Sequence, residues 1–300
     1  MRRWLLVSSV TLAVCTGLAQ QADIRVEVNL VRVVTTVKNA AGQPIGTLSK
    51  EDFTILDNNV PQQVAVFERR TEQPLSVALL IDTSGSTAKD LKYEVESVSR
   101  FLHALFAEGN PNDTVALFSF NYQVVIHNHF TRNTSSIEHS LHTLRGEAGT
   151  SLYDAIYLAS AELERRDGRR VMVIVTDGGD TTSTKNFHAA LDAAQRADTV
   201  IYPILVVPIT NDAGRNLGGE RALDSLAAGT GARVFQPMGA SELDQAFTQI
   251  LRDLRTQYLV GYYPRNLPPD TPKFHPVRVE LSRKDLRATT RTGYYGDALH

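Results

Sequence analysis

Two short apolar runs, each followed directly by an aspartate, constrain this chain more than any other feature. Leu75 to Ile81 reads LSVALLI and leads into Asp82, and Arg170 to Thr176 reads RVMVIVT and leads into Asp177. Short runs that do not alternate with polar residues are typical of strands buried on both faces of a parallel sheet. We therefore predict two buried strands of an α/β sheet, each of which ends in a polar loop.

Strand-like runs alternate with helical patterns across residues 73–255. Thr114 to Phe120 predicts a further strand, and Thr199 to Val207 predicts another. Between them, Leu152, Ile156, Ala159 and Leu163 share one face of a helix. This order indicates βαβ units, and we predict a doubly wound, mostly parallel sheet as the fold class of this region.

Both ends of the chain have a different character, because they are rich in strand patterns. Residues 20–72 contain an alternating Val- and Thr-rich run and a hairpin whose returning strand we place at Gln62 to Arg69. Residues 256–300 contain three more strand patterns. Residues 20–72 hold too few strands for a sandwich of their own. We therefore predict that the two segments pair into one β-sandwich, with the α/β domain inserted between its halves.

Hydroxyl and carboxyl side chains gather at the predicted strand ends. Asp82, Ser84 and Ser86 occupy alternate positions after the first strand, Thr150 lies at the entry of a helix, and Asp177 follows another strand. In open α/β sheets, ligands bind outside the carboxyl ends of the strands. Oxygen ligands of this kind suit a hard divalent cation such as Mg²⁺. The alternative is that the three hydroxyls only cap turns and helices.

The same five residues resemble the metal-ion-dependent adhesion site of von Willebrand factor type A domains. That family's pattern is Asp-x-Ser-x-Ser, a distant Thr, and an Asp after a further strand; Asp82, Ser84, Ser86, Thr150 and Asp177 match it at every position. The resemblance implies a Rossmann-like domain and a noncatalytic, adhesion-type role. An acidic side chain from a protein partner would complete the coordination of the metal. The sequence leaves the choice among Mg²⁺, Mn²⁺ and Ca²⁺ open.

The terminal segments carry a second, narrower resemblance. An N-terminal β segment is combined with a C-terminal pattern that reads QYLVGYYP from Gln257 and ends in Gly293-Tyr294-Tyr295. This combination resembles an exported bacterial subfamily of these proteins that is known mostly from acidobacterial genomes. It implies a location outside the cytoplasm more than it implies a role.

Residues 1–19 predict a secretory signal. Arg2 and Arg3 precede an apolar core at Trp4 to Val14, and Gly17 to Ala19 forms a small-x-small cleavage pattern. The alternative is a lipoprotein leader with lipidation at Cys15, which is the single cysteine of the chain. We expect a periplasmic or secreted protein, since no other apolar run is long enough to span a membrane.

Several other functions find little support in the sequence. A formal net charge of −2 over 300 residues gives no electrostatic reason to expect nucleic-acid binding. His127 and His129 alternate like a metal-binding pair, but no third ligand accompanies them, so we interpret them as surface residues. Ser84 and Ser86 lack the Gly-x-Ser-x-Gly context of a hydrolase nucleophile.

Three functional hypotheses follow from these patterns. The leading one is an exported, noncatalytic protein-binding module of the adhesion type that uses a divalent cation. The second is a structural or assembly protein of the cell envelope, in which the metal only stabilises the α/β domain. The third is a metal-dependent hydrolase, and it is disfavoured because the sequence shows no general base near the predicted metal. We therefore expect the chain not to be an enzyme.

Overall fold

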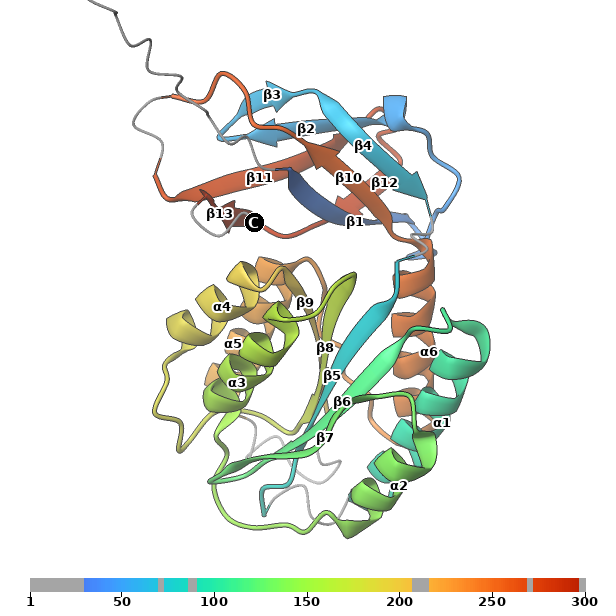
Figure 1. The fold of residues 1–300 in the computed structure, drawn as a ribbon, viewed down its shortest axis with the longest axis vertical. Coiled ribbons are helices and arrows are strands. Elements are labelled where there is room, and N and C mark those ends of the chain that lie inside the picture. The colour runs from blue at the N-terminus through green and yellow to red at the C-terminus, as the bar shows by residue number, and fades with distance from the viewer. Residues whose placement is uncertain (1–29, 70–72, 86–90, 207–215, 269–271, 297–300) are drawn as a thin grey trace, which may run out of the picture.

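The structure is a computed structural model that describes residues 30–69, 73–85, 91–206, 216–268 and 272–296. An α/β domain lies beneath a β-sandwich, and both ends of the chain contribute to the sandwich (Figure 1). The predicted leader at residues 1–19, with Cys15, lies outside the described residues, as does Ser86. None of the helices in the described part is long and apolar enough to cross a membrane.

The α/β domain is organised around a five-stranded sheet with the order β7-β6-β5-β8-β9. Strand β5 lies in the middle and runs parallel to β6 and β8, while β9 is parallel to β8 and β7 is antiparallel to β6. The strands are β5 Leu75–Asp82, β6 Thr114–Phe120, β7 Val124–Thr131, β8 Arg169–Thr176 and β9 Thr199–Leu205. The mostly parallel, doubly wound sheet predicted from the sequence is therefore confirmed.

Helices cover both faces of this sheet. The helices α1, α2 and α6 pack on one face, and α3, α4 and α5 pack on the other (Figure 1). They are α1 Leu91–Glu108, α2 Thr134–Thr143, α3 Leu152–Glu164, α4 Phe187–Arg196, α5 Leu217–Thr230 and α6 Ala240–Thr256. Every residue of β5 is buried, because alternate side chains enter the two cores. This explains why the run from Leu75 does not alternate with polar residues.

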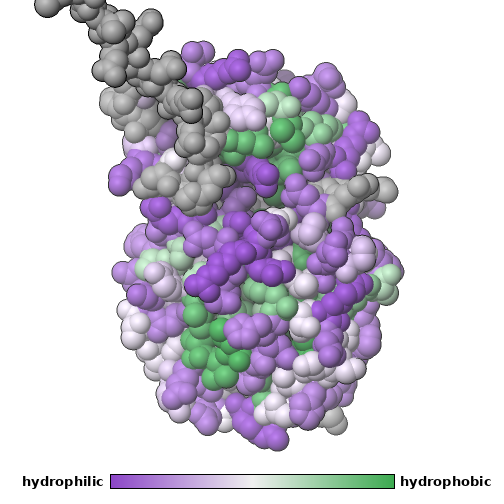
Figure 2. All heavy atoms as spheres, in the orientation of Figure 1, coloured by the Kyte–Doolittle hydropathy of each residue, from purple (hydrophilic) through white to green (hydrophobic). Residues whose placement is uncertain are grey.

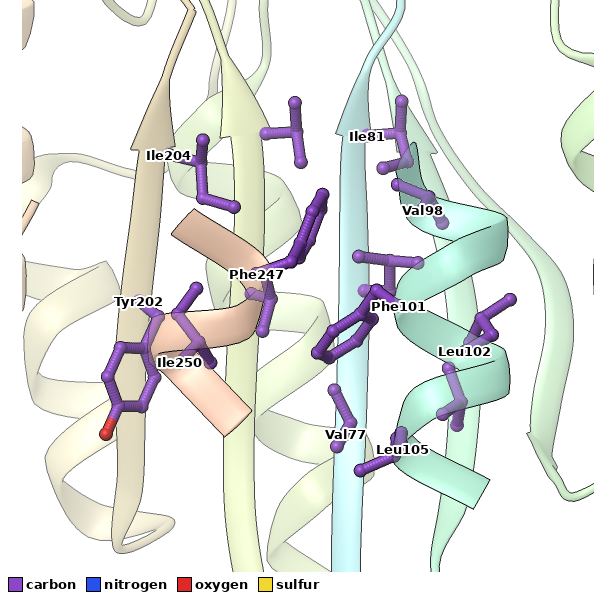
Figure 3. Close-up of a cluster of buried hydrophobic side chains, with 14 of the residues drawn as sticks. Val77, Ile81, Val98, Phe101, Leu102, Leu105, Tyr202, Ile204, Phe247 and Ile250 are labelled. Atoms are coloured by element: carbon purple, nitrogen blue, oxygen red, sulfur yellow. The ribbon is translucent and has the colours of Figure 1, made fainter. Parts of the chain in front are cut away.

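Aromatic packing joins α1 and α6 over the central strands. The rings of Phe101 and Phe247 lie 4.8 Å apart between centroids. Figure 3 shows both rings between the helices and the sheet, with Phe101 next to Val77 of β5 and Ile81 beside Val98. Such an interior is as closely packed as an organic crystal, so the strand ends of the sheet are held on a rigid base.

The sandwich consists of two four-stranded antiparallel sheets, β12-β1-β10-β4 and β13-β11-β2-β3. Strand β1 pairs with β10 and β12, and β2 pairs with β11, so the two ends of the chain form one unit. The N-terminal elements are β1 Val31–Asn39, the short helix η1 Lys50–Asp52, β2 Phe53–Asp57, β3 Val60–Gln62 and β4 Val64–Arg69. The C-terminal strands are β10 Tyr258–Tyr262, β11 Phe274–Leu281, β12 Leu286–Thr289 and β13 Gly293–Tyr295. A sandwich built from both terminal segments is part of the confirmed fold class, while the exact domain boundaries stay a prediction.

One strand prediction is wrong in this region. The returning strand expected at Gln62 to Arg69 is split, because β3 pairs with β2 in one sheet whereas β4 pairs with β10 in the other. The chain crosses between the two sheets at Gln63, which belongs to neither strand. The crossing puts Val64 into the shared core of the sandwich, and a local sequence pattern does not reveal to which sheet a strand belongs.

Polar and charged groups join the sandwich to the α/β domain. Lys38 of β1 lies 2.6 Å from Asp253 of α6, and Arg291 lies 2.7 Å from Asp198. Gln257 donates hydrogen bonds to the hydroxyls of Thr36 (3.1 Å) and Tyr202 (3.0 Å). On the face shown in Figure 2, hydrophilic residues dominate the belt where the two parts meet. The contact between the domains is therefore fixed by specific, directional bonds.

Candidate metal site

Asp82 occupies the end of the central strand and is fully buried. Its Oδ1 accepts a hydrogen bond from the backbone N–H of Ser84 at 2.8 Å, and its Oδ2 accepts one from the hydroxyl of Thr176 at 2.6 Å. Thr176 is the last residue of the neighbouring strand β8. Two adjacent strands thus fix the orientation of this carboxylate before any ligand binds.

The surroundings of Asp82 disfavour its negative charge. Burial raises the pKa of Asp82 from 3.8 to about 6, and the nearby charge of Asp177 adds to this rise. The hydrogen bonds from Thr176 and Ser84 oppose it, but they do not cancel it. Asp177 follows β8 and is half-buried. Two carboxylates therefore interact at one edge of the sheet, and a bound cation would relieve their repulsion.

Thr150 lies in the loop that leads into α3 and is buried. Its backbone N–H donates to the hydroxyl of Thr181 at 2.9 Å, and its carbonyl accepts from the N–H of Thr181 at 2.8 Å. Thr181 belongs to the loop after β8, which begins with Asp177. These reciprocal bonds join the loop that carries Thr150 to the loop that carries Asp177.

A second set of bonds ties the loop of Thr150 to the loop after β5. The N–H of Ser151 donates to the carbonyl of Asn121 at 2.6 Å, and the side-chain amide of Asn121 donates to the hydroxyl of Thr83 at 3.3 Å. The N–H of Glu147 also donates to the carbonyl of Thr83 at 2.9 Å. Gly149 has a φ of +88°, which favours glycine, and the turn there brings Thr150 to this edge.

Two acidic residues near the site hold loops in place. The carboxylate of Asp154 accepts hydrogen bonds from the backbone N–H groups of Thr184 at 2.9 Å and Lys185 at 2.8 Å. The carboxylate of Asp180 accepts one hydrogen bond from the backbone N–H of Tyr153 at 3.2 Å and another from the hydroxyl of Ser183. Both acids are engaged in shaping the loop after β8. Sequence reasoning did not single out Asp154, and its place in the first turn of α3 was the only signal for it.

The structure brings four of the five predicted ligands to one end of the sheet. Asp82 is the last residue of β5, Ser84 and Asp177 follow the carboxyl ends of β5 and β8, and Thr150 lies in the loop that leads into α3. Ser86 lies outside the described residues. The assignment of all five residues as metal ligands stays a prediction.

The donor set fits a hard divalent cation. Carboxylate and hydroxyl oxygens are what Mg²⁺ prefers, and the raised pKa of Asp82 marks a place where positive charge is favourable. Within the part of the chain that the structure describes, no group of three or more His, Cys, Asp or Glu side chains could hold a metal ion. His127 lies 2.8 Å from the hydroxyl of Ser119, and His129 lies 3.8 Å from Glu162, so each histidine has its own partner.

Fold and site together define a class: a doubly wound α/β domain whose strand ends present carboxylates and hydroxyls at one edge. Residues 77–180 match the family model of the von Willebrand factor type A domain, and the chain contains a domain of that family. No curated protein sequence matches the chain. The narrower exported subfamily stays a prediction.

Solved structures of low identity resemble this chain, and the first two described here share its fold. The vWF domain of the type V pili tip protein Mfa5 from Porphyromonas gingivalis is 14% identical, with 67% of this chain and 100% of that chain covered and a TM-score of 0.50. Proximal thread matrix protein 1 from the mussel byssus is 15% identical, with 66% and 51% covered and a TM-score of 0.52. The PilB minor pilin from Streptococcus sanguinis is 13% identical with a TM-score of 0.49; 62% of this chain is covered, and the chain spans 63% of the length of PilB.

Proposed function

We propose that this protein is an exported, noncatalytic protein-binding module of the adhesion type that binds its partner through a divalent cation, Mg²⁺ or else Mn²⁺ or Ca²⁺. One observation carries the proposal. The carboxylate of Asp82 is fully buried beside Asp177, its pKa is raised to about 6, and hydroxyl groups accompany it at the ends of parallel strands. Such an arrangement costs stability without a cation and gains it with one.

Each residue has a defined part in this proposal. Asp82 and Asp177 supply negative charge, directly or through water, and Ser84, Ser86 and Thr150 supply neutral oxygens. Two carboxylates together balance the charge of one divalent cation. Mg²⁺ requires near-ideal octahedral geometry and keeps several of its waters, so a water position remains for exchange. A carboxylate from another protein is the natural group to take that position.

The choice of a binding role over catalysis rests on the composition of the site loops. Residues 83–85, 121–123, 147–151 and 177–185 contain no histidine. The acids of these loops beyond the two proposed ligands are Asp180, whose carboxylate is engaged in loop bonds, and Glu147, which is exposed. The Mfa5 domain with the same fold comes from a pili tip protein, which agrees with a binding role outside the cell.

The first test is a calorimetric titration of the protein with Mg²⁺, Mn²⁺ and Ca²⁺, alongside Asp82→Asn. We expect one saturable site in the wild type and none in the variant. The matched control is Asp167→Asn, which removes an exposed carboxylate and should leave the titration unchanged. Equal metal binding by wild type and Asp82→Asn would contradict the proposal.

The second test addresses the carboxylate of the partner with a minimal probe. A blocked Gly-Glu-Gly peptide is titrated in saturating Mg²⁺ and followed by NMR shifts of the loop residues. The isosteric Gly-Gln-Gly peptide serves as the control, since it keeps the size and loses the charge. We expect shifts around Thr83 and Thr150 with the Glu peptide only, and their loss in excess chelator. Equal shifts with both peptides would exclude a partner carboxylate on the metal.

One observation favours the second candidate function, a structural protein in which the metal only stabilises the domain. Hydrogen bonds through Thr150, Thr181 and Asn121 already tie the three site loops together, so a metal ion would brace them further. This role predicts a large loss of thermal stability on chelation and no difference between the two peptides. The peptide titration therefore separates the two functions.

A further inference from the structure

A groove of about 670 Å³ lies where the sandwich meets the last turns of α6. Its walls come from the end of β1 and the turn at residues 39–44, from β12, and from α6. The turn contains Gly42 with a φ of +76°, and the N–H of Gln43 donates to the side chain of Asn39 at 2.9 Å. Both domains thus contribute to one concave surface.

This groove is strongly basic in a chain whose overall charge is slightly negative. Four cationic side chains line it, and Asp253 is its one acid. The Nζ of Lys38 forms an ion pair with Oδ2 of Asp253 at 2.6 Å. Arg233, Arg252 and Arg287 are exposed, and no ion pair engages them within the described residues. Three positive charges therefore face the groove without a counter-charge from the described part of the chain.

The arrangement of these cations opposes local stability. Lys38 and Arg287 are directly opposite each other on the paired strands β1 and β12. Like charges at opposite positions of an antiparallel pair are destabilising. Arg252 precedes Asp253 on α6, so a further cation is added to the same surface. An anionic partner would relieve this repulsion.

One of the arginines is held in a defined position. The guanidinium of Arg233 donates to the side-chain carbonyl of Gln249 at 2.7 Å, and it lies 4.3 Å from the ring centroid of Phe235. A guanidinium fixed in this way has lost part of its rotamer freedom before binding, so less entropy is lost when it meets a carboxylate. The groove is thus partly preorganised for an anion.

We propose that this groove, Lys38, Arg233, Arg252 and Arg287 with the turn at residues 39–44, binds an acidic polypeptide segment. The charge fits carboxylates, and guanidinium groups pair with them in a bidentate manner. No aromatic side chain is among the described residues that line the groove, so it offers no stacking platform for bases or sugar rings.

The groove is remote from the candidate metal site. Asp82 lies where β5 ends, away from the sandwich, whereas the end of α6 leads directly into β10 of the sandwich (Figure 1). An acidic segment in the groove is therefore a contact separate from a carboxylate on the metal. The inference does not depend on the proposed function, because no group of the metal site takes part in it.

The test uses fluorescence anisotropy of a labelled octaglutamate peptide with the full mature chain, in excess chelator. The groove variant carries Arg233→Gln, Arg252→Gln and Arg287→Gln together. The matched control carries Lys50→Gln, Arg221→Gln and Arg265→Gln, which are exposed, form no ion pair in the described part, and lower the charge by the same amount. We expect the groove variant to bind about tenfold more weakly, as three exposed charge pairs would give, and the control to bind like the wild type.

Three outcomes would overturn the inference. Equal weakening of binding in both triple variants would show an effect of net charge only. Binding that needs Mg²⁺ or disappears in Asp82→Asn would place the peptide at the metal site. Tighter binding of a sulfated polysaccharide than of octaglutamate, lost in the same groove variant, would show that the occupant is a glycan. Circular dichroism of each variant confirms that the fold is retained.

Discussion

At one end of the central sheet two carboxylates, Asp82 and Asp177, lie close enough for one to raise the pKa of the other, whereas at the opposite end Lys38 faces Asp253 and Arg291 faces Asp198. Both ends bury charge, and at the second end each of these acids is paired with a cation of the chain. Burial lowers the pKa of Arg169 at that end to about 10, so its guanidinium keeps its charge at neutral pH.

The two ends of the sheet illustrate two roles for buried charge: one holds the structure together, and the other favours the binding of a ligand. A buried charge with a partner in the same chain holds two elements together, and its removal leaves the partner without compensation. A buried carboxylate beside another carboxylate destabilises the protein unless a cation binds there. The two ends should therefore respond in opposite ways to the loss of an acidic group.

The largest effect should come from Asp253→Ala at the junction of the domains. The variant leaves Lys38, whose side chain is 18% exposed, without its counter-charge. We expect the free energy of unfolding to fall by about 3 kcal/mol. The matched control on the same helix is Asp244→Ala, which breaks an exposed pair with Arg100 and should cost about 0.5 kcal/mol. Urea unfolding measures both, and equal losses would contradict a structural role for the buried pair.

The opposite sign is expected for Asp82→Asn in the absence of metal. The amide of asparagine has a similar shape but carries no charge. It replaces a carboxylate whose pKa is raised by burial to about 6. In excess chelator at neutral pH, we expect the variant to be more stable than the wild type by about 2 kcal/mol. In saturating Mg²⁺ the order should reverse, because only the wild type gains binding energy. A variant that is less stable under both conditions would mean that Asp82 is structural.

The pH dependence sharpens the same contrast. Because the pKa of Asp82 is raised, its native state holds the proton more tightly than the unfolded chain does between pH 3.8 and about 6. The metal-free protein should therefore lose stability from this group as the pH rises through that interval, and Asp82→Asn should lack this component. Mg²⁺ competes with the proton, so its apparent affinity should fall about tenfold per unit below pH 6. Thermal melts and calorimetry across this range provide the measurement, and a pH-independent affinity would contradict it.

The smallest effect should come from the loop that carries Thr150. An alanine at Gly149 would place its Cβ 3.0 Å from the Cβ of Tyr122, at a φ of +88°. We expect Gly149→Ala to cost about 1 kcal/mol and to weaken Mg²⁺ binding. The control is Gly42→Ala, which has a φ of +76° and open space around the new Cβ. Gly42→Ala should lower the free energy of unfolding by a similar amount without changing the affinity for Mg²⁺. Equal weakening of Mg²⁺ binding in both variants would contradict a role for the Thr150 loop in the metal site.

Much of the fold could be predicted from local patterns. The runs ending in Asp82 and Asp177 are apolar at nearly every position because both faces of β5 and β8 are covered. The gathering of Asp82, Ser84 and Thr150 at one edge follows from the fact that parallel strands end together. In each case, the feature depends on residues that are close in the sequence, within one strand, one helix or one boundary between a strand and a loop.

The remaining features depend on contacts that leave no local pattern. The bond from Thr176 to Asp82 joins residues 94 positions apart, and the pair of Lys38 and Asp253 joins residues 215 apart. The split between β3 and β4 depends on which distant strand each one pairs with. The basic groove is hidden in the sequence for the same reason, because its arginines come from separate elements of both domains.

The pairing of β1 with β10 also determines how the molecule carries a mechanical load. Val31 is opposite Tyr262, and Thr35 is opposite Tyr258, the first residue after the connection from α6. When the chain is held on the N-terminal side of β1 and pulled at the far end of the α/β domain, these two strands are drawn in opposite directions along their length. The hydrogen bonds between them then share the force in shear, so they must break together and not one at a time. We therefore expect the pairing of β1 with β10 to resist such a load more strongly than a pair of strands that opens from one end.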